Sequence, residues 1–309
     1  MKKNRNQYID VVKGLLILVV ILRHIFQKAA CNSDSDYLCN LMAIIEMPLF
    51  IAISGYFSVP ILFDRNIIDF KIKKKIKRIS IAYLIPFFSY FIVFRLFYYE
   101  NFKGISSVGA VFFNISESLW YLFAIWALNI IALISFIFAK SPKNDLVKFI
   151  IYTIVYFGFV FGYLLLGLKV NINFLGCKLI VYYSVYYYIG YCFRIFQEKA
   201  ITIYKRQENI ILCILAAGYF LGGYKFKVMA VPDTTIYIII RFLLAISGMV
   251  TFLHFSYMIY KRLSCKVIKK IGVHTLELYY VHSFLMNSLF LNRAKVLMSM
   301  NGLLNSFIL

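Results

Sequence analysis

Residues 8–24, with the sequence YIDVVKGLLILVVILRH, combine an apolar run suited to a membrane with four polar side chains. Asp10 and Lys13 lie near the start of this stretch, and Arg23 and His24 lie near its end. Charged side chains inside a lipid-spanning helix are costly and usually face the protein interior or a wet cavity. At about 100° per residue, Lys13 and His24 fall on the same side of a helix. The stretch therefore predicts a first transmembrane helix with one polar face directed inward.

The rest of the chain has the composition of a helical membrane protein. Of its 309 residues, 62% are hydrophobic and 15% are charged, which is more apolar than a water-soluble domain of this length needs. Apolar runs of about 20 residues recur, and each is long enough to cross a bilayer core of about 30 Å. The predicted spans are about 9–27, 41–63, 79–99, 117–139, 148–168, 174–196, 208–224, 235–260 and 274–292. The apolar segment 296–309 is either a re-entrant or interfacial piece or the start of a tenth span.

The distribution of basic residues predicts the orientation of the chain. Its formal net charge is +21 at pH 7, with 34 Lys and Arg residues. When the N-terminus is placed inside, most of these residues fall in cytoplasmic loops, as the positive-inside bias requires. Because the charge lies in short loops between apolar runs, we expect membrane lipids and no nucleic acid as partners. We therefore predict an all-α, polytopic transmembrane bundle of nine or ten spans, folded as one membrane domain over residues 1–309.

The second predicted span contains the segment IIEMPLFIAISGYF, residues 44–57. Glu46 lies about one turn below the outer boundary of this span, close to the depth expected for His24. A carboxylate within reach of an imidazole fixes the tautomer of the ring and raises its basicity. We therefore expect Glu46 to orient His24.

Several motifs occur in an order that resembles one family of membrane enzymes. They are Asp10-x-x-Lys13-Gly14 with the run ending in His24, Met47-Pro48-Leu49-Phe50, Ser54-Gly55-Tyr56, KIKKKIKRISIAYLIPF (71–87), SLWYL (118–122), YYYIGYCFR (186–194) and IGVHTLELYYVHSF (271–284). Together they resemble the acyltransferase 3 family of integral membrane acyltransferases, and look closest to its fucose 4-O-acetylase-like branch. The chain has Lys13 where many members have Arg, and Arg23 where Gly is common. It has Glu46 where the related branch often has His.

The resemblance implies an O-acyltransferase that moves an acyl group, usually acetyl from acetyl-CoA, to a hydroxyl of a cell-surface or lipid-linked glycan. It makes His24 the essential residue, either as general base or as transient acyl carrier. A sugar hydroxyl is a poor nucleophile and needs a base, and an imidazole that titrates near neutral pH suits this task. Acyl-CoA is then a co-substrate. No tightly bound cofactor is expected, and the six cysteines show no metal-ligand spacing.

The donor is anionic, so basic residues near the cytoplasmic side are candidates for binding it. We select Lys13, Lys75 and Arg78, although the positive-inside bias alone also explains the basic loop 64–78. Asp10, one turn before Lys13, joins His24 and Glu46 as a catalytic candidate. The alternative for Asp10 and Lys13 is an interfacial pair that reaches back to the membrane surface.

The remaining candidates are placed at the acceptor. The residues expected to line the acceptor site are Arg23, Ser54, Tyr56, Trp120, Tyr279 and His282. Trp120 would equally serve as an anchor at the membrane interface. Arg241 lies inside the eighth predicted span and needs a carboxylate partner, for which both Glu277 and Asp10 are candidates.

Two other functions fit the composition. A transporter or flippase for a glycan would also line its path with polar side chains. A non-catalytic membrane partner in glycan assembly would explain the departures at Lys13 and Glu46. The ordered motifs favour the enzyme, and the chain's richness in Lys, Ile and Asn suggests a bacterium. The sequence therefore predicts an enzyme of the bacterial cytoplasmic membrane and leaves its acceptor sugar and oligomeric state open.

Overall fold

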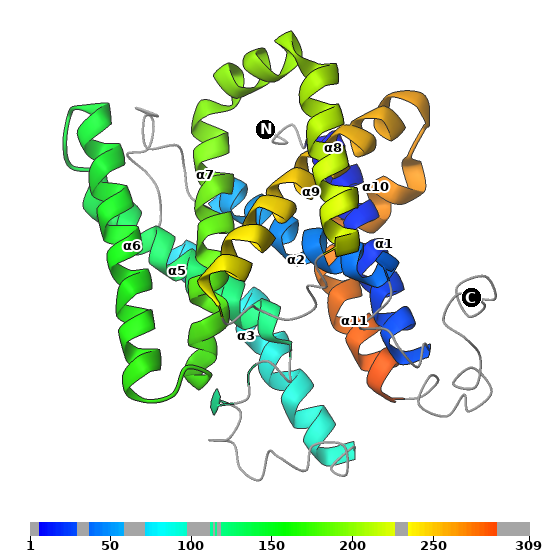
Figure 1. The fold of residues 1–309 in the computed structure, drawn as a ribbon. Helices are drawn as coiled ribbons and strands as arrows, with labels where there is room; N and C mark the ends of the chain where they lie inside the picture. The colour runs from blue at the N-terminus through cyan, green and yellow to red at the C-terminus, as the bar shows by residue number, and fades with distance from the viewer. Residues whose placement is uncertain are drawn as a thin grey trace. The chain divides into compact units, whose positions relative to one another are not determined.

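The structure is a computed structural model that describes residues 6–29, 37–58, 72–97, 112–113, 115, 119–225 and 234–288. Within these residues all regular secondary structure is helical (Figure 1). The helices are α1 (Gln7–Ala29), α2 (Tyr37–Ser58), α3 (Ile72–Phe97), α5 (Trp120–Ala139), α6 (Asp145–Lys169), η5 (Phe174–Gly176), α7 (Cys177–Arg206), α8 (Glu208–Lys225), α9 (Thr235–Arg262), α10 (Lys266–Val273) and α11 (Thr275–Ser288).

Every predicted span coincides with one of these helices, so the prediction of an all-α polytopic bundle is confirmed. Among the described residues, α2, α5, α6 and α9 are long and apolar enough to cross a membrane by length and composition. The other predicted spans contain charged or tyrosine-rich turns, which lower their mean hydropathy. Helix α11 is also shorter than a membrane-spanning helix. The α7 helix continues to Arg206, beyond its predicted end at 196. Segment 296–309 lies outside the described residues.

The chain divides into two compact units. Unit 1 comprises Met1–Phe50 and Ile201–Leu309, and unit 2 comprises Ile51–Ala200. Both boundaries fall inside a helix, one within α2 and the other within α7. The single domain expected over residues 1–309 stays a prediction.

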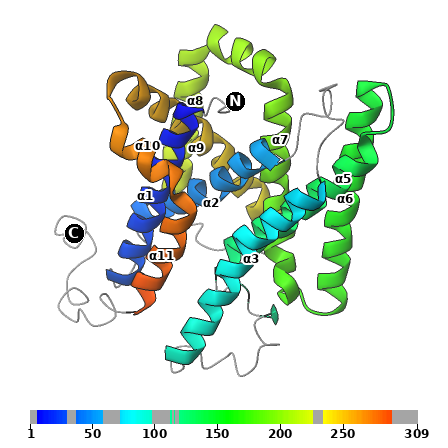
Figure 2. The ribbon, with the colours of Figure 1, turned by 180° about the vertical axis from the view of Figure 1, so that it is seen from behind.

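In unit 1, α1 packs against α9, α10 and α11, and Figures 1 and 2 both show it beside the last two. Two glycines permit the close contact with α10. A Cβ atom at Gly14 would collide with the backbone carbonyl of Ile268, and one at Gly272 would collide with that of Asp10. Small residues let membrane helices approach closely. The contact therefore fixes the first half of α1, with Asp10 and Lys13, against α10.

Two hydrogen bonds connect the first turns of α1 and α2 to other helices of unit 1. Near the start of α1, the Tyr8 hydroxyl donates to the carbonyl of Leu253 in the last part of α9, at 2.8 Å. Near the start of α2, the Asn40 amide donates to the carbonyl of Gly223, close to the end of α8, at 2.5 Å. The start of α1 therefore meets the last part of α9, and the start of α2 meets the end of α8.

In unit 2, the buried helix α5 packs against α3 and α6. The end of α2 meets α7 through Gly55 and Gly190, where a Cβ would collide with the backbone carbonyls of Tyr187 and Ala52. The Tyr187 hydroxyl also donates to the Asn129 side-chain oxygen at 3.1 Å, which links α7 to α5. These contacts position the segment of α2 that carries Ser54 and Tyr56.

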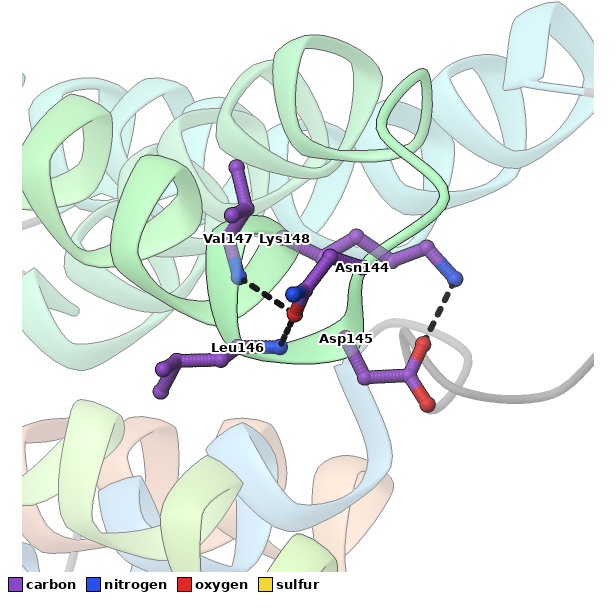
Figure 3. A network of polar contacts seen from close by, with 5 residues as sticks. All are labelled: Asn144, Asp145, Leu146, Val147 and Lys148. Carbon is purple, nitrogen blue, oxygen red and sulfur yellow. Dashed lines mark hydrogen bonds and ion pairs between the residues drawn. The ribbon is translucent and has the colours of Figure 1, made fainter.

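Helix α6 begins with a cap that its sequence specifies (Figure 3). The Asn144 side-chain oxygen accepts hydrogen bonds from the backbone N–H groups of Leu146 at 2.8 Å and Val147 at 3.4 Å. Asp145 in the first turn pairs with Lys148 at 2.8 Å, and its negative charge favours the positive end of the helix dipole.

Replacing Asn144 by alanine is expected to lower the free energy of unfolding by about 1 kcal/mol, because two backbone donors lose their acceptor. The thermal unfolding midpoint of the purified protein in detergent measures this loss. Asn144→Ser is the matched control, since serine caps helices about as well as asparagine. Equal destabilisation by both substitutions would contradict the capping role.

Candidate active site

Two imidazoles and a phenol meet in unit 1. The rings of His24 in α1 and His282 in α11 are stacked, with centroids 5.4 Å apart and planes inclined by 29°. The ring of Tyr279, one turn earlier in α11, meets that of His282 at 5.3 Å and 60°. Tyr279 and His282 are buried. The structure therefore brings together three candidates that the sequence named in two distant segments.

Each histidine is oriented by a neighbour on its own helix. His24 Nδ1 lies 3.0 Å from the Gln27 side-chain oxygen, and His282 Nδ1 lies 3.1 Å from the carbonyl oxygen of Leu278. Because a carbonyl oxygen only accepts, Nδ1 is the donor in both rings, and Nε2 is the basic nitrogen of each neutral imidazole. Gln27 was not among the residues predicted from the sequence, although its position three residues after His24 places it on the same helix face.

A buried ion pair joins α1 to α2 beside His24. The Arg23 guanidinium lies 2.5 Å from Glu46 Oε1, and the Glu46 side chain is only 2% exposed. Glu46 was predicted to orient His24, and in the structure its carboxylate pairs with Arg23, the residue before His24. A role of Glu46 in orienting His24 stays a prediction. A guanidinium is always charged and presents several donors in a fixed fork, so it competes strongly for a buried carboxylate.

Helix α9 contributes a second guanidinium near this pair. Arg241 is 3% exposed and close enough to Glu46 to act on it electrostatically. Glu277, one of the two carboxylates expected beside Arg241, is exposed instead and lies 3.7 Å from His274. A buried carboxylate near Arg241 is thus Glu46, which was not predicted from the sequence, and pairing of Arg241 with Asp10 stays a prediction.

The other α1 candidates lie at the opposite end of the helix. Asp10 is buried and Lys13 is half-buried, and both lie where α1 packs on α10. Along the helix axis, Lys13 is about 16 Å from His24, and Asp10 is about 21 Å away. Asp10 is therefore not part of the histidine cluster, although it was named with His24 as catalytic.

The remaining donor candidates belong to unit 2. The Lys75 amine donates a hydrogen bond to the backbone carbonyl of Ser58, so it fixes the first turns of α3 to the end of α2. Arg78, one turn further along α3, is exposed. Their selection for donor binding stays a prediction.

The acceptor candidates of unit 2 lie on α2 and α5. The Tyr56 hydroxyl donates to the Gln197 side-chain oxygen at 2.7 Å, and Ser54 is hydrogen-bonded to the Tyr121 side chain. Trp120, the first residue of α5, stacks on Tyr183 with ring centroids 5.1 Å apart and planes inclined by 25°. These side chains are thus fixed within unit 2, and their contact with an acceptor stays a prediction.

The family of the chain follows from a match that covers nearly its whole length. A family model described as an acyltransferase domain, that of the acyltransferase 3 family, matches residues 6–295. No curated protein and no solved structure matches the chain. The chain belongs to the acyltransferase 3 family and is a membrane acyltransferase, which confirms the resemblance seen in its motifs at the level of the family.

Proposed function

We propose that this membrane acyltransferase moves an acyl group, acetyl from acetyl-CoA, to a hydroxyl of a cell-surface or lipid-linked glycan. The observation that carries the proposal is the stacked pair of His24 and His282, in which Nε2 of each ring is the basic nitrogen. Transfer of an acyl group to a hydroxyl needs a positioned base. Within unit 1, this pair supplies it.

In the proposed reaction, His24 Nε2 takes the proton of the acceptor hydroxyl while the hydroxyl oxygen attacks the thioester carbonyl. A C–O bond forms and the C–S bond breaks, and the proton then passes from the imidazolium to the departing thiolate. Gln27 keeps the ring oriented by accepting from Nδ1. His282 and Tyr279 position the acceptor. In the second route, Nε2 itself accepts the acyl group from the thioester and passes it to the hydroxyl.

The proposed location is the bacterial cytoplasmic membrane with the N-terminus inside. Lys13 then lies at the donor side and His24 lies about 16 Å further along α1, toward the outside. The acyl group crosses most of this distance while the nucleotide part of the donor stays at the cytoplasmic surface. Lys75 and Arg78 are further donor contacts, and Ser54, Tyr56 and Trp120 are acceptor contacts. No nucleic acid, metal or tightly bound cofactor takes part.

Mass spectrometry of the surface glycan tests this function. Cells that produce the protein are compared with cells that lack it, and an acetyl group is expected on the glycan only in the former. Detection of a longer acyl group on the glycan, such as succinyl, would change the identity of the acyl-CoA donor but not the class of reaction. An unmodified glycan whose export depends on the protein would support a transporter and overturn the proposal.

A further inference from the structure

A surface that is both basic and aromatic lies at the end of unit 1 where α1 begins. It is formed by the first turn of α1, the last turns of α9 and the short helix α10. We call it the basic–aromatic surface, and it comprises Tyr8, Tyr257, Tyr260, Lys261, Lys269 and Lys270. The reaction proposed above assigns no role to any of these residues.

The three tyrosines of this surface form a fixed group. The Tyr8 ring meets those of Tyr257 and Tyr260 at centroid distances of 5.8 and 5.9 Å. Its hydroxyl is fixed by the hydrogen bond to the carbonyl of Leu253. Tyr257 is nevertheless 39% exposed. The group therefore presents one partly exposed aromatic ring at this surface.

Two of the three lysines, Lys261 and Lys269, are held against the same rings, and Lys270 is exposed beside Lys269 in α10. The Lys261 amine lies 4.7 Å from the Tyr257 ring centroid, and the Lys269 amine lies 5.2 Å from that of Tyr260. Lys269 also donates to the Gln7 side-chain oxygen at 3.0 Å. A lysine that only sets membrane orientation needs no such contacts. These amines are therefore positioned over aromatic faces by cation–π attraction.

The surface is connected to His24 through α1. Because α10 packs on α1 at Gly14 and Gly272, the lysines of α10 lie near the N-terminal end of α1, the helix that carries His24. Lys13 lies at the same end, about 16 Å along the axis from His24. Asp10, the carboxylate of α1 in this region, is buried. One helix thus connects a basic surface to the proposed reaction centre.

We propose that the basic–aromatic surface binds the nucleotide part of the acyl-CoA donor. The lysines contact the phosphates, and the adenine stacks on the exposed tyrosine ring. The neutral arm of the donor then extends along α1 toward His24. This inference rests on the proposed function, because it takes acyl-CoA as the donor. Anionic lipid headgroups also carry phosphates, but they have no base to stack on a ring.

Isothermal titration of the purified, full-length protein in a neutral detergent tests the inference, with coenzyme A and adenosine 3′,5′-bisphosphate as probes. The double substitution Lys269→Gln and Lys270→Gln is expected to weaken binding of both probes by about tenfold or more, the effect of losing charge-assisted contacts. Tyr257→Leu keeps apolar bulk and removes the ring, and it is also expected to weaken both. The matched control is Lys140→Gln with Lys143→Gln, in the turn between α5 and α6, which should bind both probes as the wild type does.

The outcomes separate this inference from the proposed function. If the wild type binds coenzyme A and the Lys269/Lys270 variant binds it equally well, the surface is excluded and the proposed function stands. If the wild type does not bind coenzyme A, the donor itself is wrong and both fail.

A titration with lipid tests the other source of phosphate, the lipid headgroups. The same proteins are titrated with a short-chain phosphatidylglycerol below its micellar concentration. Loss of lipid binding in the Lys269/Lys270 variant, with unchanged affinity for coenzyme A, would assign the surface to headgroups and overturn the inference. The thermal unfolding midpoints of the wild type and all variants are compared, so that a loss of binding through unfolding is excluded.

Discussion

Replacing His24 by glutamine is expected to reduce acyl transfer by about 10²- to 10⁴-fold, the range that a general base contributes. Glutamine has hydrogen-bonding groups of similar reach but no basic nitrogen, so it removes the proton acceptor at the point where α1 meets α11. The measurement is transfer of labelled acetyl from acetyl-CoA to the glycan fraction in membranes that contain equal amounts of wild type or variant.

A second histidine provides the control for this substitution. His274 lies between α10 and α11 with its side chain 54% exposed, and His274→Gln is expected to leave transfer unchanged. His282→Gln should raise KM for the acceptor more than it lowers kcat, because His282 is assigned to positioning. Undiminished transfer by His24→Gln, at equal protein levels, would remove His24 from the mechanism.

The two routes through His24 are distinguished by omitting the acceptor. If His24 carries the acyl group, incubation with labelled acetyl-CoA alone should leave the label on the peptide that contains His24. If His24 acts only as a base, no label should remain on that peptide in the same experiment.

The fold was largely predictable, because apolar length and loop charge together determine where the helices of a membrane protein lie. The polar face of α1 was also predictable, since Lys13 and His24 repeat at helical spacing. The contact between His24 and His282 could not be predicted from the spacing of residues in the sequence. The two residues lie near opposite ends of the chain, and only the resemblance to a family linked their segments.

The partners of the charged residues could not be predicted, because the depth of a residue says nothing about the rotation of its helix. Glu46 was placed at the depth of His24, but neighbouring residues on a helix point about 100° apart. In the structure the carboxylate lies on the side of Arg23. Arg241 shows the same limit, since its carboxylate neighbour comes from a helix far away in sequence.

Removing one member of the Arg23–Glu46 pair is expected to be strongly destabilising. Glu46→Ala removes the carboxylate that faces the Arg23 guanidinium, whose side chain is 13% exposed, and breaking a buried pair in this way costs about 3–5 kcal/mol. The loss is measured as the fall in thermal unfolding midpoint in detergent. The exposed pair of Asp145 and Lys148 is the control, because Asp145→Asn should cost less than about 1 kcal/mol.

Replacing both members by apolar residues separates structure from catalysis. Arg23→Met with Glu46→Leu is expected to regain most of the lost stability, since well-packed apolar residues often substitute for a buried ion pair. If the double variant is stable but transfers acyl groups slowly, the pair positions His24, which follows Arg23 directly in α1. If the double variant is stable and fully active, the pair only joins α1 to α2. If Glu46→Ala is no less stable than Asp145→Asn, the ion pair does not hold these helices together, and the position of His24 depends instead on its contact with His282 in α11.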